Sequence, residues 1–183
     1  MEEDSVLPAA DIAALTDREF HILKSTWPVI ENRLREDGNI IFVRLFEKHP
    51  HYKIFFPDFE YLTDAELMYN ERLTDHVSRI SIGLKILLHT TIDPSALDHA
   101  TCAIVNTHHM RGIRREHFND FNELFLDYVS EVLDTHCSMA TPCCEKEYVS
   151  FVIRDDDARQ VWKKAMELLI WGMSYDDSKK QLY

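Results

Sequence analysis

Two stretches decide the fold of this 183-residue chain: Leu73-Thr74-Asp75-His76-Val77-Ser78-Arg79-Ile80 and Asn106-Thr107-His108-His109-Met110-Arg111-Gly112-Ile113. Each carries a histidine within a helical pattern of apolar residues, and His76 and His108 are 32 positions apart. A single histidine on an apolar helical face is more often an ordinary core or surface residue than a ligand. The pair becomes informative only if the rest of the chain brings the two histidines face to face.

The composition favours one all-α domain. A hydrophobic content of 45% over 183 residues is ample for a core. Only four glycines and six prolines occur, whereas a sandwich or barrel needs a turn roughly every 8–12 residues. The two ends are polar, so we expect a flexible N-terminal extension over 1–15, a single domain over 16–175 and a C-terminal tail over 176–183.

The net charge of −12 disfavours nucleic acid and anionic membranes as partners, because both are bound by clustered Lys and Arg and no basic stripe is visible. No window reaches the roughly 18 apolar residues of a membrane span. The start, Met1-Glu2-Glu3-Asp4, lacks the features of a secretory signal. We therefore expect a cytoplasmic protein with no membrane span.

The four cysteines have neither the spacing of a zinc site nor the density of a disulfide framework. We expect free thiols. A bridge from Cys137 to Cys143 or Cys144, forming a redox-sensing loop, is the alternative. The four positions are Cys102, Cys137, Cys143 and Cys144.

Three helix starts are marked in the sequence. Thr16 with Glu19, and Thr63 with Glu66, form capping boxes, in which hydroxyl and carboxylate satisfy free backbone N–H groups. Asp93-Pro94 is a third start. Apolar stripes at three- and four-residue spacing then predict helices over 17–35, from about 40 to Pro50, and over 64–89, 94–107, 113–135 and 156–174. The long connection over 136–155 contains Pro142.

The order and spacing of the apolar residues resemble those of a globin over 17–175, in particular the nematode, other invertebrate and neuronal branches. Trp27 lies in the first helix, and Phe56 follows six residues after Pro50. Phe59 comes three residues later, and His76 comes twenty residues after Phe56. The resemblance implies the globin fold, a three-over-three helical sandwich around haem b, with the extended loop before the last helix as a departure.

The resemblance also implies roles for particular residues. His108 matches the proximal iron ligand, and His76 matches the distal histidine. Phe56 matches the phenylalanine that stacks on the haem. The remaining cofactor-binding positions that it implies are Phe42, Arg79, Ile80, Ile113 and Phe118. Gly38 and Val77 match the crossing of the second and distal helices, where Val77 is bulkier than the family pattern.

The 32-residue spacing of the two histidines resembles that of neuronal globins, and Val77 and Phe42 are bulky. The resemblance therefore favours iron bound by both His76 and His108, and a role in electron transfer or in redox or gas sensing. The alternative is a pentacoordinate globin that stores or transports oxygen. A third hypothesis is a haem-free interaction module with the same fold. No phosphate loop or nucleophile elbow occurs, so any catalysis would be haem redox chemistry on oxygen, nitrite or NO. The expected partners are oxygen, CO, NO or an electron-transfer protein, and the oligomeric state is open, a homodimer included.

Overall fold

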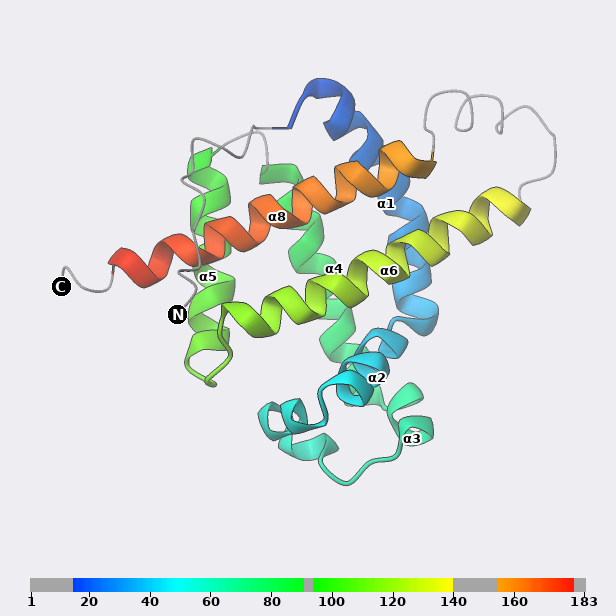
Figure 1. Cartoon of the computed structure of the whole chain (residues 1–183), viewed down its shortest axis with the longest axis vertical. Helices are drawn as coiled ribbons and strands as arrows, with labels where there is room; N and C mark the ends of the chain where they lie inside the picture. The colour runs from blue at the N-terminus through cyan, green and yellow to red at the C-terminus, as the bar shows by residue number, and fades with distance from the viewer. Residues whose placement is uncertain (1–14, 91–93, 140–154, 180–183) are drawn as a thin grey trace, which may run out of the picture.

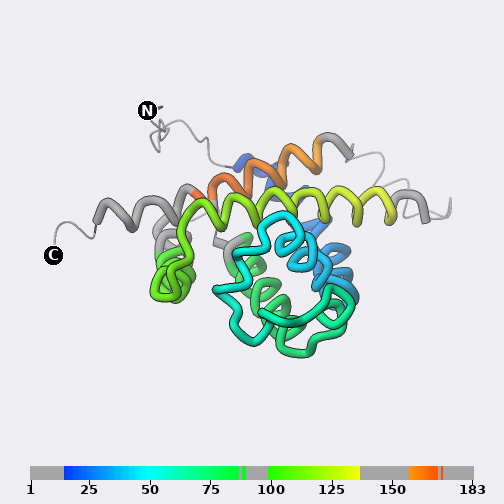
Figure 2. Tube along the Cα trace, turned by 60° about the horizontal axis from the view of Figure 1, so that its bottom comes forward, coloured from blue at the N-terminus to red at the C-terminus, as the bar shows by residue number. Residues whose placement is uncertain are grey.

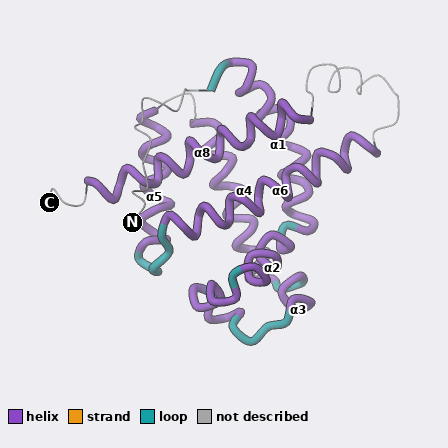
Figure 3. Tube along the Cα trace, viewed as in Figure 1, coloured by secondary structure: helices purple, strands orange, loops and turns teal. Residues whose placement is uncertain are grey.

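Helices make up almost all of the computed structural model, which describes residues 15–90, 94–139 and 155–179 (Figure 3). No strand occurs in these ranges, so the all-α prediction is confirmed. Most of the connection expected over 136–155 lies outside the described residues, as do Cys143 and Cys144. The expectation of free thiols therefore stays a prediction.

The described part of the chain contains seven α-helices and two 3-10 helices. Both capping boxes are present: Thr16 Oγ1 accepts from the Glu19 N–H at 3.2 Å, and Thr63 Oγ1 accepts from the Glu66 N–H at 3.3 Å. The elements are α1 (Asp17–Asp37), α2 (Asn39–Lys48), η2 (Pro50–Phe55), η3 (Pro57–Phe59), α3 (Asp64–Met68), α4 (Glu71–Thr90), α5 (Pro94–His109), α6 (Arg115–Met139) and α8 (Asp155–Lys179).

The single helix predicted over 64–89 is wrong, because the chain breaks between α3 and α4. Asn70 lies at the break, and its Oδ1 accepts from the Leu73 N–H at 3.1 Å, which starts a new helix. The Asn39 side-chain amide reaches the same break from α2, 3.2 Å from the Leu67 carbonyl and 3.0 Å from Thr74 Oγ1. The break places His76 near the start of its own helix, α4.

The helices form two layers of three, as the three-over-three prediction requires. In one layer α4 contacts both α1 and α5, and in the other α6 contacts both α2 and α8. Figure 1 shows α6 and α8 crossing in front of α1 and α4, and Figure 2 shows α6 and α8 running side by side in opposite directions. Trp162 lies between the layers, fully buried, and its indole N–H donates to Thr26 Oγ1 at 2.9 Å. No helix in the described part of the chain is long and apolar enough to cross a membrane.

The approach of α2 to α4 is very close at Gly38. A Cβ atom at Gly38 would lie 2.7 Å from Val77 Cγ1 and 2.5 Å from the Leu34 carbonyl oxygen. Such distances are shorter than carbon contacts allow, so the position admits only glycine without a shift of the backbone. The crossing therefore sets the position of α4, the helix that carries His76.

Candidate functional site

His108 lies at the end of α5 with its imidazole already oriented. Its Nδ1 is 2.8 Å from the carbonyl oxygen of Ile104, which can only accept, so Nδ1 carries the proton and donates. In a neutral ring the proton on Nδ1 leaves the lone pair on Nε2. The ring of Phe118, on α6, lies edge-on at a centroid distance of 5.1 Å. The side chain thus presents one ring nitrogen as a potential metal ligand.

The turn after His108 holds the end of α5. Gly112 has a φ of 81°, the left-handed conformation that ends many helices. The N–H groups of Arg111 and Ile113 both donate to the His108 carbonyl, at 2.9 and 3.2 Å. Ile113 is half-buried at this corner, before α6 begins at Arg115 and not at the expected 113.

We expect Gly112→Ala to lower the free energy of unfolding by about 1–2 kcal/mol, because a Cβ atom is disfavoured at positive φ. Urea unfolding of the haem-free chain followed by circular dichroism measures this effect. Gly112→Asn is the matched control, since asparagine also ends helices in this conformation and should lose less. Equal losses for both variants would argue that the side chain collides with Phe55 instead, which lies 3.6 Å from a Cβ at this position.

His76 is half-buried on α4 between two aromatic rings. Its ring centroid is 5.3 Å from that of Phe42 and 5.6 Å from that of Phe56, both edge-on. None of the residues that the structure describes makes a hydrogen bond with its ring nitrogens. Burial, together with the smaller effects of the positive charges of His108, Arg79 and Arg111, lowers the pKa of His76 to about 4. His76 is therefore a neutral imidazole at pH 7, with a nitrogen lone pair available.

An aromatic cluster surrounds this side of the site. Phe42 on α2 is buried and contacts Phe56 at 5.7 Å, Phe46 at 6.0 Å and Phe121 at 5.6 Å. Phe56 in turn stacks on Phe59 at 5.7 Å with an interplanar angle of 12°. Phe46 and Phe121 were not among the predicted site residues. The signal was present, since Phe46 lies one turn after Phe42 and Phe121 one turn after Phe118.

Two arginines lie near His76, one on α4 and one just beyond the end of α5. Arg79 is exposed on α4, and Arg111 is exposed beyond the end of α5, where its guanidinium donates to the Thr107 carbonyl at 2.5 Å. The charge of each lowers the pKa of His76. Arg79 was a predicted site residue, whereas Arg111 was not recognised. Ile80, one turn beyond His76, is partly buried against the core.

The predicted residues thus form two groups, one around His76 on α4 and one around His108 on α5, and these two helices are in contact. His76, Phe42 and Phe56 form one group, and His108 and Phe118 form the other. The charge of His108 lowers the pKa of His76, so the two imidazoles lie within electrostatic range of one another. Within the described ranges no three His, Cys, Asp or Glu side chains gather as a metal cluster. Two imidazoles in an aromatic setting suit the axial positions of an iron cofactor, not a four-ligand zinc site.

Comparisons with known proteins agree on one family. The family model named Globin matches residues 39–170. Cytoglobin-1 of Danio rerio is 22% identical over 175 residues, covering 91% of this chain and 92% of the relative. Myoglobin of Ascaris suum is 26% identical over 96 residues, covering 51% of this chain and 63% of the relative. Among solved structures, the Drosophila melanogaster globin superposes with a TM-score of 0.70 at 18% identity, covering 88% of this chain and 94% of that one.

Proposed function

The chain belongs to the globin family, and on this premise we propose that it binds haem b with His108 and His76 as the two axial ligands of the iron. The observation that carries the proposal is the state of the two imidazoles. His108 directs its proton to a backbone carbonyl, and His76 has a pKa of about 4. A histidine must be neutral to bind a metal, and burial with the neighbouring charges keeps His76 in this form at pH 7, while the hydrogen bond from His108 Nδ1 leaves its other ring nitrogen for a metal.

The chemistry of the surrounding residues fits haem. Phe42, Phe56 and Phe118 supply apolar and aromatic surface next to the two histidines. Haem carries two carboxylates, and Arg79 and Arg111 supply positive charge on the same side of the molecule as His76. Ile80 and Ile113 complete the proposed lining. The globin domain of the proposal is 16–175.

Haem, when bound, supplies an iron that changes oxidation state and binds small diatomic molecules. His108 would hold it from α5, and the Ile104 carbonyl would fix the plane of that imidazole and increase its basicity. His76 would hold the iron from α4, so that oxygen, CO or NO would have to compete with its imidazole. Phe42 and Phe56 restrict the movement of the His76 ring by edge contacts.

Competition by His76 favours electron transfer or redox or gas sensing over oxygen storage, and these are the roles we propose for a cytoplasmic protein. Pentacoordinate oxygen binding is the competing function, and the spectrum of the ferrous protein separates the two.

We expect the ferrous protein without added ligand to show the sharp visible bands of low-spin, six-coordinate haem. In His76→Leu these bands should be replaced by one broad five-coordinate band, because leucine has no nitrogen for the iron. The association of CO should accelerate by at least about tenfold, since 1.4 kcal/mol of competing coordination corresponds to a factor of ten. Visible spectroscopy and stopped-flow CO binding measure both effects.

His89→Leu is the matched control, because His89 is an exposed histidine near the carboxyl end of the same helix. It should leave both the spectrum and the CO rate unchanged. A broad five-coordinate band in the unmodified ferrous protein would refute bis-histidyl coordination and support the oxygen-binding alternative. The absence of a Soret band after haem is offered would refute haem binding altogether.

A further inference from the structure

The arginines of this chain fall into two classes. Of the ten arginines in the described residues, six form ion pairs with a carboxylate: Arg18, Arg33, Arg35, Arg44, Arg72 and Arg159. The other four have no carboxylate partner among those residues: Arg79, Arg111, Arg114 and Arg115. In a chain with a net charge of −12, four exposed arginines without an ion pair are unexpected.

These four arginines lie around the site. Arg79 lies on α4 three residues after His76, and Arg111 lies three residues after His108, just beyond the end of α5. Arg114 lies in the same turn as Arg111, and its guanidinium is 3.3 Å from the His109 carbonyl. Arg115 begins α6 at this corner, which Figure 1 shows at the lower left, between α5 and α6. We call Arg79, Arg111, Arg114 and Arg115 the arginine surface.

A structural role accounts for only part of this charge. Arg111 and Arg114 satisfy carbonyl groups in the last turn of α5, a usual place for basic side chains. Each guanidinium has five N–H groups, so most of its donors stay available after one such bond. Two haem carboxylates would neutralise two of the four charges. The nearest acidic side chain in the sequence, Glu116, lies 3.9 Å from His117 Nδ1.

We propose that the arginine surface docks an acidic electron-transfer protein beside the iron site, which gives the proposed redox function its partner. This docking rests on the proposed haem function, and charge complementarity selects the face of the protein at which it occurs. Positive charge next to the site, on an otherwise acidic protein, steers a negatively charged partner to this face and away from the others.

One exposed apolar side chain favours a protein over an extended polyanion. Met110 is 87% exposed and lies between His109 and Arg111. Protein interfaces are enriched in methionine and arginine and often place an apolar residue within a charged rim. An anionic membrane or a nucleic acid is a wide negative surface. Outside the arginine surface the protein is acidic, so it would repel such a partner.

The sign of the salt dependence tests the proposal. The probe is reduced flavodoxin, an acidic flavoprotein, and the measurement is the second-order rate constant for reduction of the ferric haem protein. Two proteins that interact through their net negative charges react faster as salt is added. Docking at the arginine surface predicts the opposite, a fall of at least about tenfold between roughly 10 and 500 mM ionic strength.

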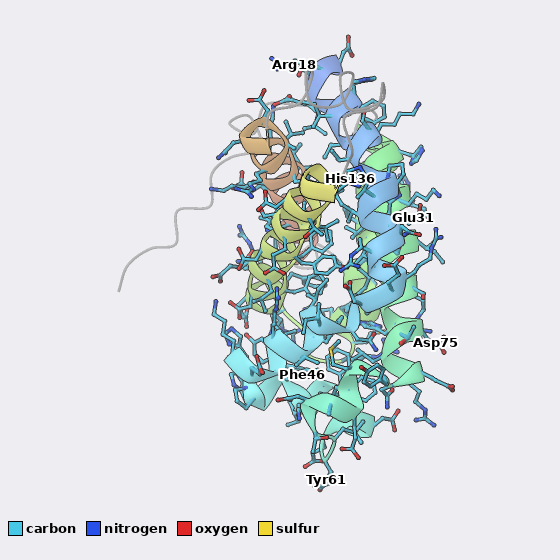
Figure 4. All side chains as sticks on the ribbon, turned by 90° about the vertical axis from the view of Figure 1, so that its right-hand side faces the viewer. Arg18, Glu31, Phe46, Tyr61, Asp75 and His136 are labelled. Carbon is cyan, nitrogen blue, oxygen red and sulfur yellow. The ribbon has the colours of Figure 1, made fainter. Side chains whose placement is uncertain are left out.

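The double variant Arg114→Glu/Arg115→Glu should reduce the rate constant at low salt by at least about tenfold and reverse its salt dependence. The matched control is Arg18→Glu/Lys24→Glu, which makes the same change of charge on α1. Arg18 is exposed at the end of the molecule opposite Tyr61 (Figure 4). The control should stay within about twofold of the unmodified protein at every salt concentration.

Equal effects of the two double variants, or a rate that rises with salt in the unmodified protein, would overturn the proposal. Calorimetric titration with oxidised flavodoxin at low salt checks docking without haem, so failure of haem binding and failure of docking are distinguished. Sedimentation with phosphatidylserine vesicles tests whether the arginine surface binds lipid instead. Binding that Arg114→Glu/Arg115→Glu abolishes would assign the surface to lipid and refute the protein partner.

Discussion

His108→Gly is expected to weaken haem retention by more than about 100-fold, because it removes the axial nitrogen oriented by the Ile104 carbonyl. Even the loss of a hydrogen-bonded partner of a metal ligand costs about 10- to 100-fold in affinity, and the ligand itself should cost more. Titration of the haem-free protein with haem, followed at the Soret band, measures the change. Added imidazole should restore haem binding by occupying the space of the missing ring.

His109→Gly is the matched control, since it makes the same substitution in the adjacent position, about 100° further around the helix. Both variants place a glycine in the last turn of α5 and should lose similar helix stability. A similar loss of haem in both variants would mean that the end of the helix has unfolded, and the assignment of His108 as ligand would lose its support.

Gly38→Ala is expected to lower the free energy of unfolding by about 2–3 kcal/mol, because the new methyl group meets Val77 Cγ1 at 2.7 Å and the Leu34 carbonyl at 2.5 Å. The Leu34 oxygen belongs to the backbone and cannot move aside alone. Urea unfolding of the haem-free chain measures the effect. The same variant should also alter the visible spectrum, since α4 carries His76.

Gly83→Ala supplies the control on α4 itself. A Cβ atom at Gly83 meets nothing closer than Ile104 Cδ1 at 3.9 Å, and Gly83 lies within α4. Alanine there should stabilise the protein by about 0.5–1 kcal/mol. In the double variant Gly38→Ala/Val77→Ala, part of the loss should be recovered because Cγ1 is gone. No recovery would assign the cost to the Leu34 backbone alone.

The fold was predictable where a helix start depends only on residues close to it in the sequence. Both capping boxes and the Asp93-Pro94 start marked helix ends that depend only on neighbouring residues. The break between α3 and α4 was not predictable in this way. The apolar spacing continues across it, and the break is stabilised by Asn39, which comes from a helix about 30 residues earlier.

Several contacts among the candidate site residues were predictable, and their electrostatics were not. Phe42 and Phe56 lie against His76, and Phe118 lies against His108, as the globin resemblance implied. The low pKa of His76 was not predicted, because it depends on burial and on charges from two helices. The role of Arg111 was missed for the same reason, since its position follows from the turn at Gly112.

The close packing of Gly38 against Val77 restricts the movement of α4 beside its histidine. Val77 directly follows His76, and the crossing leaves α4 no room to move toward α2. Under bis-histidyl coordination, an incoming gas must therefore do work against this packing to displace the His76 ring. The packing of Gly38 against Val77 therefore affects both the affinity for gas and the free energy of unfolding. A variant with weaker packing at this crossing should bind gas more tightly and unfold more readily.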